Sequence, residues 1–338
     1  MLPVTTQSDD VASQAPSFRD DDARWEAVRR RDRTADGAFF YSVRTTGVYC
    51  RPSCAARLPR RENVGFHQTW ADAERAGFQP CKRCLPGGPT RSAQQVAAGS
   101  RSTLPISERI MRLDWATVST ELDAHGTATI GPLLTAQECA ELITGYEIDE
   151  RFRSRIIMAR HGFGRGEYKY FAYPLPETVA ALRAALYPPL AAIANRWHEA
   201  MGITTRYPQQ HAQFLGQCHG AGQVKPTPLL LRYGIGDYNC LHQDIYGAHV
   251  FPLQVVFLLS RPGDDFEGGE LVLTEQRPRM QSRAEVVPLA PGEGAIIPVH
   301  HRPVQGTRGC YRVNMRHGVS RLRSGRRHTL GIIFHDAS

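Results

Sequence analysis

Two close pairs of cysteines constrain the first quarter of this chain more than any other feature. Cys50 and Cys54 have three residues between them, Cys81 and Cys84 have two, and 26 residues separate the pairs. Two close pairs on either side of a folded insert are typical of a tetrahedral zinc site with four cysteine ligands. A module of this size has little apolar core, and bound zinc supplies the missing folding free energy. The sequence therefore predicts a zinc-binding module over residues 20–86.

Composition divides the rest of the chain. Residues 1–19 are polar and aperiodic, which predicts a disordered leader. Residues 87–106 are rich in Gly, Pro, Ser and Ala, which predicts a linker. The 338 residues suffice for two domains, so a second domain is expected over residues 107–338. The remaining cysteines are scattered and are expected to be small core hydrophobes: Cys139, Cys218, Cys240 and Cys310.

Helical patterns precede strand patterns in the second domain. Thr135 and Glu138 form a capping-box pair that predicts the start of a helix. A long helical pattern over residues 176–201 contains Pro188 and Pro189, where a break is expected. From residue 228 onward, short β-rich runs are separated by Gly- and Pro-rich turn signals. This order predicts an α+β chain in which helices buttress a β-sandwich or jelly roll.

Basic residues gather in two places. The formal net charge is +8, and clustering of this kind suits a polyanion such as nucleic acid, with a solvated arginine-rich surface as the alternative. No apolar run is long enough to span a membrane and no signal-peptide pattern opens the chain, so a soluble cytoplasmic protein without membrane contact is expected. Thiols that stay reduced there favour metal binding over disulfides. The clusters are Arg29, Arg30, Arg31, Arg57, Arg60, Arg61, Lys82 and Arg83 around the cysteines, and Arg321, Arg323, Arg326 and Arg327 near the C-terminus.

The positive charge around the cysteines indicates a second possible role for the zinc site, in catalysis. From spacing alone, a purely structural zinc is the simpler interpretation. Four thiolates on Zn²⁺ leave a net charge of about −2, so a coordinated thiolate stays nucleophilic at neutral pH. Arginines that dock a phosphate backbone would bring such a thiolate to an alkyl group carried on that backbone. A neutral phosphotriester would approach the anionic cluster more easily than an ionised phosphate.

The residues around the four cysteines resemble a known family. "FFYSVRTTGVYCRPSCAARLPRRENVGF" and "AGFQPCKRCLP" are similar to the N-terminal domain of the Ada methylphosphotriester-DNA alkyltransferases, over residues 20–86. The resemblance implies that Cys50 accepts a methyl group irreversibly while remaining a zinc ligand, with Cys54, Cys81 and Cys84 as the other ligands. The family's helix-turn-helix and its Pro-Cys-His-Arg motif do not follow in this sequence, so a role as transcriptional activator is not implied.

A histidine–carboxylate pair marks the second domain. His242 and Asp244, in "LLLRYGIGDYNCLHQDIYG", are two residues apart near an apolar strand, so their side chains are expected on the same face. His317 is the preferred third ligand of a two-histidine, one-carboxylate site for Fe(II) with three open positions. Arg327, at the start of the last strand, suits bidentate binding of a dicarboxylate. The alternative is His300 or His301 as third ligand, with Arg308 as the anion clamp.

This half of the chain resembles the 2-oxoglutarate/Fe(II) dioxygenases. "RYGIGDYNCLHQD" is similar to a segment of the AlkB-type DNA dealkylases, which implies that Tyr233 contacts 2-oxoglutarate. "HGVSRLRSGRR" resembles the distal motif of the prolyl-hydroxylase-like branch. Residues 107–338, with "RPRMQSRAEVVPL" and "HHRPVQGTRG", resemble a bacterial oxygenase family predicted to act on alkylated DNA. The resemblance implies a double-stranded β-helix (jelly roll) and the cofactors Fe²⁺, 2-oxoglutarate and O₂.

Together the two halves predict direct-reversal repair of alkylated DNA. The zinc-bound cysteine would take methyl groups from backbone phosphotriesters, and the oxygenase would hydroxylate N-methyl groups of bases, which then leave as formaldehyde. The alternative is a zinc module that only recruits a hydroxylase acting on a protein or RNA. DNA is the expected partner, and no oligomeric state is predicted.

Overall fold

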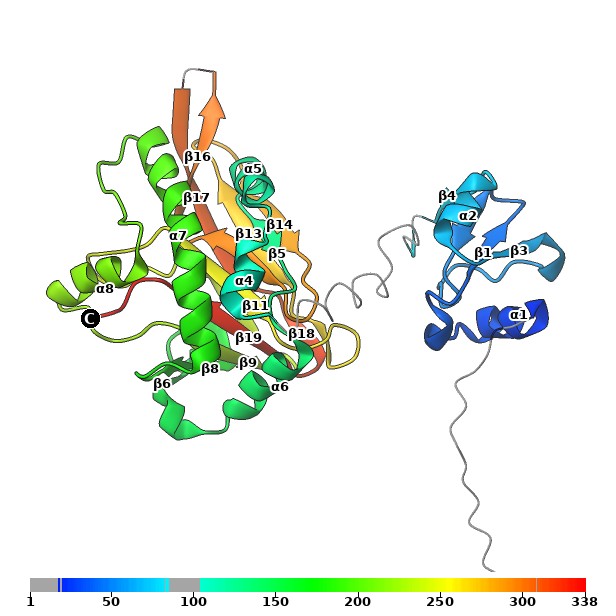
Figure 1. Ribbon diagram of the computed structural model, residues 1–338, viewed down its shortest axis with the longest axis horizontal. Helices are drawn as coiled ribbons and strands as arrows, with labels where there is room; N and C mark the ends of the chain where they lie inside the picture. Colours follow the sequence, from blue (N-terminus) through cyan, green and yellow to red (C-terminus); the bar gives the residue numbers. More distant parts are fainter. Residues whose placement is uncertain (1–17, 19, 82, 85–103, 308) are drawn as a thin grey trace, which may run out of the picture. The chain divides into compact units, whose positions relative to one another are not determined.

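The computed structural model describes residues 18, 20–81, 83–84, 104–307 and 309–338 (Figure 1). Contacts divide the chain into two units, Met1–Gly99 and Ser100–Ser338, each considered separately below. The predicted leader and linker lie almost wholly outside the described residues, and the predicted domain boundaries stay predictions. No helix in the described part of the chain is long and apolar enough to cross a membrane.

The first unit is a small antiparallel-based sheet flanked by two helices. Its strands have the order β3-β1-β2-β4, and β4 runs parallel to β2. Helix α1 begins where the Asp20 carboxylate accepts a hydrogen bond from the Ala23 amide at 2.7 Å, and α2 begins with a capping box between Thr69 and Asp72. The elements are α1 (Asp21–Arg30), η1 (Arg33–Ala35), β1 (Phe40–Val43), β2 (Val48–Cys50), η2 (Arg61–Asn63), β3 (Val64–His67), α2 (Trp70–Arg75) and β4 (Gln79–Pro80).

Helices of the second unit follow the sequence signals closely, with one exception. Asp114 caps α5, Gly126 ends it in the left-handed conformation, and Thr135 and Glu138 form the predicted capping box of α6. The helical elements are α4 (Ile106–Met111), α5 (Trp115–His125), α6 (Ala136–Gly145), η3 (Asp149–Arg151), η4 (Met158–Arg160), α7 (Glu177–Ala200) and α8 (His211–Gly220).

The break predicted at Pro188 and Pro189 is wrong, because α7 continues through both prolines. Each proline removes one backbone hydrogen bond and would ordinarily kink or end the helix. Here the apolar face on both sides of the pair is buried, from Leu182 and Leu186 to Leu190 and Trp197. Packing of this continuous face stabilises the helix more than the missing hydrogen bonds destabilise it.

Two antiparallel sheets make up the rest of the second unit. The larger sheet has the order β5-β15-β11-β19-β9-β8-β6, and the smaller has β14-β13-β17-β10-β7, with β16 also paired to β17. A separate pair joins β12 and β18. The strands are β5 (Ala128–Ile130), β6 (Phe152–Ile157), β7 (Gly164–Arg165), β8 (Glu167–Phe171), β9 (Leu229–Tyr233), β10 (Tyr238–His242), β11 (Leu253–Leu258), β12 (Phe266–Gly268), β13 (Leu271–Gln276), β14 (Arg283–Val287), β15 (Gly294–Pro298), β16 (His301–Gly306), β17 (Gly309–Val319), β18 (Leu322–Gly325) and β19 (Arg327–Ile332).

Four of these strands lie among the helices, which the expected order of helices followed by strands did not include. β5 pairs with β15 at one edge of the larger sheet, β6 and β8 extend its other edge next to β9, and β7 pairs with β10. Such short segments are stabilised by hydrogen bonds to strands far along the chain, a contribution that local sequence patterns do not reveal.

Alternating side chains place the larger sheet between the helices and the smaller sheet. Val255 and Phe257 of β11 and Leu330 of β19 pack into the core formed with α4, α5, α6, α7 and α8. On the opposite face, Ala295 and Ile297 of β15 pack against strands β13 and β17. The unit therefore has three layers: the helices, the larger sheet and the smaller sheet. The space between the two sheets is bounded by one sheet on each side.

Cys139 and Cys218 are buried, as expected of small core residues, but Cys240 and Cys310 are exposed, so for these two the expectation is wrong. Both lie on strands of the smaller sheet, whose outer face is open to solvent. Alternation along β10 and β17 turns part of each strand outward, and a scattered cysteine in a sequence does not indicate which face it occupies.

A buried ion pair joins α7 to the C-terminal segment. Arg183 Nη2 lies 2.7 Å from Asp336 Oδ1, and both side chains are almost wholly buried. Arg183 also donates to the Ile333 carbonyl at 2.9 Å, and Asp336 accepts hydrogen bonds from Tyr173 and His219. Burial by itself would raise the pKa of Asp336. The Arg183 charge and these hydrogen bonds outweigh burial and lower it.

We expect Arg183→Met to lower the free energy of unfolding of the second unit by about 3–5 kcal/mol, because it leaves the Asp336 carboxylate buried without its partner. Arg196→Met is the matched control: Arg196 lies on the same helix, and its ion pair with Asp123 is exposed, so its loss should cost about 1 kcal/mol or less. Urea unfolding followed by circular dichroism measures both. Equal losses for the two variants would show that the buried pair has no special role.

Candidate metal centres and cofactor cavity

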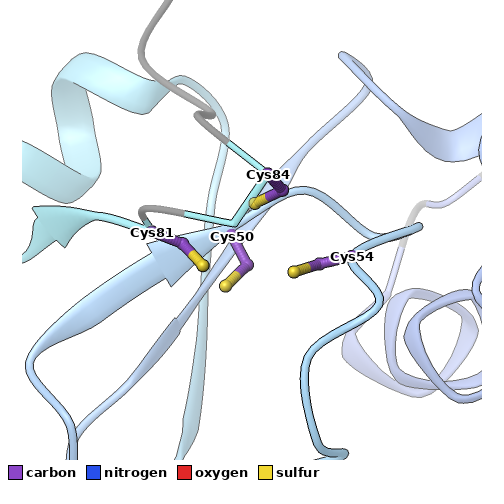
Figure 2. Close-up of side chains that lie close together, drawn as sticks. All are labelled: Cys50, Cys54, Cys81 and Cys84. Atoms are coloured by element: carbon purple, nitrogen blue, oxygen red, sulfur yellow. The ribbon is translucent and has the colours of Figure 1, made fainter.

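The four cysteines of the first unit converge on one point. Cys50 ends β2, Cys54 follows in the turn after it, and Cys81 and Cys84 follow β4. Their sulfur atoms all lie within 4.8 Å of one another and point toward a common centre (Figure 2). The parallel pairing of β2 with β4 brings the two pairs together, because the Cys81 amide donates to the Tyr49 carbonyl at 3.0 Å.

The ionisation of the four clustered thiols suits the binding of a divalent metal ion. Hydrogen bonding from the Cys50 thiol lowers the pKa of Cys84 to about 5, whereas the same interaction, together with burial, raises the pKa of Cys50. Burial raises the pKa of Cys54 to about 11. Four sulfurs this close cannot all ionise without a cation to compensate their charge. A tetrahedral zinc ion supplies that compensation and would replace the shared protons.

Arginines are fixed beside the loop that follows Cys54. Arg31 donates to the Ala56 carbonyl at 3.3 Å, and Arg83 donates to the Ala55 carbonyl at 3.1 Å. Arg57 and Arg60 are exposed on the same loop. Arg29 and Arg30 instead form ion pairs with Glu26 on α1. Lys82 lies outside the described residues. The cluster therefore has cationic side chains on the adjoining loop.

Removal of zinc by a chelator should unfold the first unit while the second unit stays folded, since only the first unit lacks a sizeable core without the metal. Hydrogen exchange read peptide by peptide would show loss of protection in β1 to β3 and none in α7. Re-addition of zinc should restore the protection. Retained protection in β1 to β3 after complete zinc removal would show that the fold does not need the metal.

A second cluster lies between the two sheets. His242 ends β10 and is the register partner of His317 on β17, and Asp244 follows two residues later. His317 Nε2 lies 3.2 Å from Asp244 Oδ2, and His242 Nε2 lies 3.5 Å from Asp244 Oδ1. His242 Nδ1 donates to the Cys240 carbonyl at 2.8 Å, which leaves Nε2 free to face the cluster. The predicted three residues are thus brought together.

Asp244 is held by partners that the sequence analysis did not identify. Tyr246 donates to Asp244 Oδ1 at 2.8 Å, and the buried Gln254 of β11 donates to Oδ2 at 2.9 Å. Burial by itself would raise the pKa of Asp244. Hydrogen bonds from the two histidines outweigh burial and hold this pKa well below its usual range. The same contact with Asp244 outweighs burial and raises the pKa of His242, whereas burial lowers that of His317. An ionised carboxylate between two histidines suits a divalent metal.

Arg327 and Tyr233 lie on adjacent strands and line the same cavity as this cluster. They are register partners across β19 and β9, and the guanidinium lies 5.7 Å from the centre of the Tyr233 ring. Arg327 Nε and Nη1 and the Tyr233 hydroxyl are buried and make no hydrogen bond with the described residues. Burial lowers the pKa of Arg327 to about 10 and raises that of Tyr233 to about 12. The cavity, of about 210 Å³, is otherwise mainly aromatic and aliphatic.

An unpaired buried guanidinium requires an anion, because a buried charge without a partner is strongly destabilising. No carboxylate among the described residues lies within ion-pair distance of Arg327. A dicarboxylate bound between the metal cluster and Arg327 would satisfy both the metal's open positions and the guanidinium. The residues of the cavity therefore fit 2-oxoglutarate with iron.

The alternative third ligands lie elsewhere. The rings of His300 and His301 meet edge to face, with centres 4.3 Å apart, and neither residue belongs to the group of His242 and Asp244. Burial lowers the pKa of His300 to about 4. Arg308, the alternative anion clamp, lies outside the described residues.

Local sequence signals were too weak to identify Gln254, Tyr246 and Tyr170 as part of the site. Gln254 is a single polar residue in the apolar run of β11, and its alternation with Val255 turns it toward the smaller sheet. Tyr170 hydrogen-bonds the Tyr246 hydroxyl at 3.2 Å from β8, more than 70 residues earlier in the chain. A lone glutamine within a buried strand was the only available signal.

Replacing Tyr246 by Phe should weaken iron binding by about 10-fold, and by at most about 100-fold, because Asp244 loses a hydrogen bond that orients it. Tyr311→Phe, a substitution on β17 outside the cavity, is the control and should leave the affinity unchanged. Competition with a coloured chelator measures the affinity without any catalytic assay. An unchanged affinity for Tyr246→Phe would show that Asp244 does not depend on this contact.

Two family models match separate parts of the chain. One, described as "Oxygenase, catalysing oxidative methylation of damaged DNA", matches residues 166–337. The other, "Metal binding domain of Ada", matches residues 23–87. The first match covers the cavity lining except Phe163, and the second covers the four cysteines.

Individual proteins show the same division. An uncharacterized protein of Mycobacterium tuberculosis is 46% identical over 168 residues, which are 50% of this chain and 72% of that protein. The bifunctional transcriptional activator/DNA repair enzyme Ada of Escherichia coli is 58% identical over 66 residues, which are 20% of this chain and 19% of that protein. A crystal structure of a Pseudomonas putida prolyl-4-hydroxylase aligns with a TM-score of 0.41 at 14% identity, over 66% of this chain and 99% of that one.

Proposed function

Because this chain belongs to the oxygenase family whose model spans residues 166–337, and also carries an Ada-type metal-binding domain, we propose that it repairs alkylated DNA by direct reversal at two centres. The cofactors of these families are zinc for the Ada-type domain, and Fe²⁺, 2-oxoglutarate and O₂ for the oxygenase. DNA is the proposed partner of both centres, and the cysteine centre and the oxygenase centre would act on different alkylated groups of it.

One observation carries the proposal for the second unit. A single cavity is lined both by His242, Asp244 and His317 and by the unpaired buried Arg327. A three-residue metal site next to a buried cation without a partner is the arrangement that iron and 2-oxoglutarate together would occupy. The two facing antiparallel sheets support the proposal that the oxygenase domain is a double-stranded β-helix.

Each residue of the cavity has a defined task in this proposal. The iron would be held by His242, Asp244 and His317. Together with 2-oxoglutarate and O₂, the bound iron would supply the oxidising chemistry that hydroxylates a C–H bond. Arg327 would bind the far carboxylate of 2-oxoglutarate, and the Tyr233 hydroxyl would donate a hydrogen bond to it. Tyr246 and Gln254 would orient the Asp244 carboxylate through their hydrogen bonds. Hydroxylation of an N-methyl group gives a hemiaminal, which releases formaldehyde and restores the base.

In the first unit, Cys50 is the proposed methyl acceptor. Its sulfur would attack the methyl carbon of a phosphotriester, so that an S–C bond forms, the C–O bond breaks, and the phosphate leaves as a diester anion. Arg31 and Arg83, which donate hydrogen bonds to carbonyls of the loop after Cys54, would contact the neighbouring phosphates. After transfer, the cluster has one negative charge fewer and would repel DNA less. A zinc module already bound to DNA would raise the effective concentration of the oxygenase at damaged sites.

The test combines both chemistries in one reaction. The zinc- and iron-loaded protein is incubated with 2-oxoglutarate and an oligonucleotide that carries a methylated base and a methylphosphotriester. Formaldehyde release that His242→Ala abolishes, with a gain of one CH₂ unit on the Cys50 peptide that Cys50→Ser abolishes, is the expected result. DNA binding without a mass gain would favour a recruiting zinc module. Succinate formation that DNA does not stimulate would favour a protein or RNA substrate.

Arg327→Met should raise the KM for 2-oxoglutarate by about 10- to 100-fold, because each hydrogen bond to a charged group contributes about 1.5–3 kcal/mol. Arg326→Met is the matched control: Arg326 is the adjacent residue but is exposed, and its loss should leave this KM unchanged. Succinate formation against 2-oxoglutarate concentration gives both values. An equal KM for Arg327→Met and the native protein would contradict the assignment of Arg327.

A further inference from the structure

An aromatic pair lies at the mouth of the oxygenase cavity and has no task in the proposal above. The rings of His161 and Phe163 stack, with centres 5.3 Å apart and planes inclined by 23°. Phe163 lines the cavity together with His242 and Asp244, yet 47% of it is exposed. A large ring that is both part of a cavity wall and open to solvent is suited to a ligand that enters from outside.

The backbone holds Phe163 in a fixed position relative to the iron cluster. Its amide donates to the Met158 carbonyl at 3.2 Å, and its carbonyl accepts a hydrogen bond from Cys240, two residues before His242, at 2.9 Å. The next residue, Gly164, has a φ of +127° and lies so close to β10 that a Cβ there would be 2.4 Å from the Tyr238 carbonyl oxygen. The segment is therefore packed directly on the strand that carries His242.

Cationic side chains flank this aromatic pair in the sequence. Arg160 and Arg165 are both exposed, and among the described residues Arg165 has one ion-pair contact, with Asp237 at 4.0 Å. Within the described ranges Arg160 forms no ion pair. Arginines beside exposed rings provide a surface suited to single-stranded nucleic acid, because bases stack on the rings and the arginines neutralise the phosphates.

We propose that Phe163, supported by His161, is the platform on which the substrate base stacks, and that Arg160 and Arg165 bind the phosphates on either side. The inference rests on the proposed function and specifies the form of its substrate: a base in single-stranded DNA, or one turned out of a duplex. A base within a paired stack has both faces covered by its neighbours and cannot lie on Phe163. Two exposed arginines that flank the ring in the chain favour a polyanion over a neutral peptide.

Phe163→Ala should lower kcat/KM for formaldehyde release from a methylated single-stranded oligonucleotide by about 10-fold or more, the effect of losing one base–aromatic stack. Phe163→Trp retains a flat ring and should keep kcat/KM near the native value. Ile148→Ala, which removes another exposed apolar side chain of the same unit, is the control and should have no effect. Arg160→Gln should weaken the salt dependence of KM, because one fewer phosphate contact releases fewer counterions.

The outcomes separate the inference from the function on which it rests. If the native protein releases formaldehyde from methylated DNA but Phe163→Ala does so equally well, the stacking platform is wrong and the proposed function stands. A loss in Phe163→Ala that Phe163→Trp fails to restore would indicate a structural role for the side chain and also overturn the platform. If the native protein releases no formaldehyde from single-stranded or duplex DNA, both are overturned.

Discussion

The register between β10 and β17 is the constraint on which the oxygenase cavity depends. His242 and His317 are direct partners across these antiparallel strands, although they lie 75 positions apart in the chain. A slip of one residue would turn one of the histidines to the solvent face of the smaller sheet and leave Asp244 without its partner. The same pairing fixes the position of Cys240, whose amide anchors the segment that carries Phe163. One strand pair thus sets both the metal cluster and the entrance to the cavity.

Buried charge explains why the cavity requires ligands. Asp244 is satisfied by two histidines, Tyr246 and Gln254, so its negative charge is stabilised without cancelling the capacity to bind metal. Arg327 is the opposite case, since its guanidinium is buried against Tyr233 and Phe266, and two of its nitrogen atoms have no hydrogen-bond partner among the described residues. By contrast, the equally buried Arg183 has Asp336 as its partner. The difference between a paired and an unpaired buried arginine separates a structural contact from a binding site.

The two units are stabilised in different ways. The second unit buries an extended core between the helices and the larger sheet, together with a smaller one between the sheets. The first unit has a small core in which Cys50, Cys54 and Cys81 are themselves members, so the metal-binding residues are also part of the packing. A change at the metal, such as conversion of one thiolate to a thioether, would therefore alter the stability of the module itself.

Features that depend on local spacing or on a short motif could be predicted from the sequence. These include the two cysteine pairs, the capping box of α6 and the His242–Asp244 pair, while the role of His317 as the third iron ligand stays a prediction. Three-dimensional contacts were needed to show that α7 continues through Pro188 and Pro189, that Cys240 and Cys310 face solvent, and that Gln254, Tyr246 and Phe163 belong to the cavity. The physical reason is that caps and ligand pairs rest on interactions within a few residues. Burial and sheet register instead depend on contacts between residues far apart in the chain, whose free energies no local pattern records.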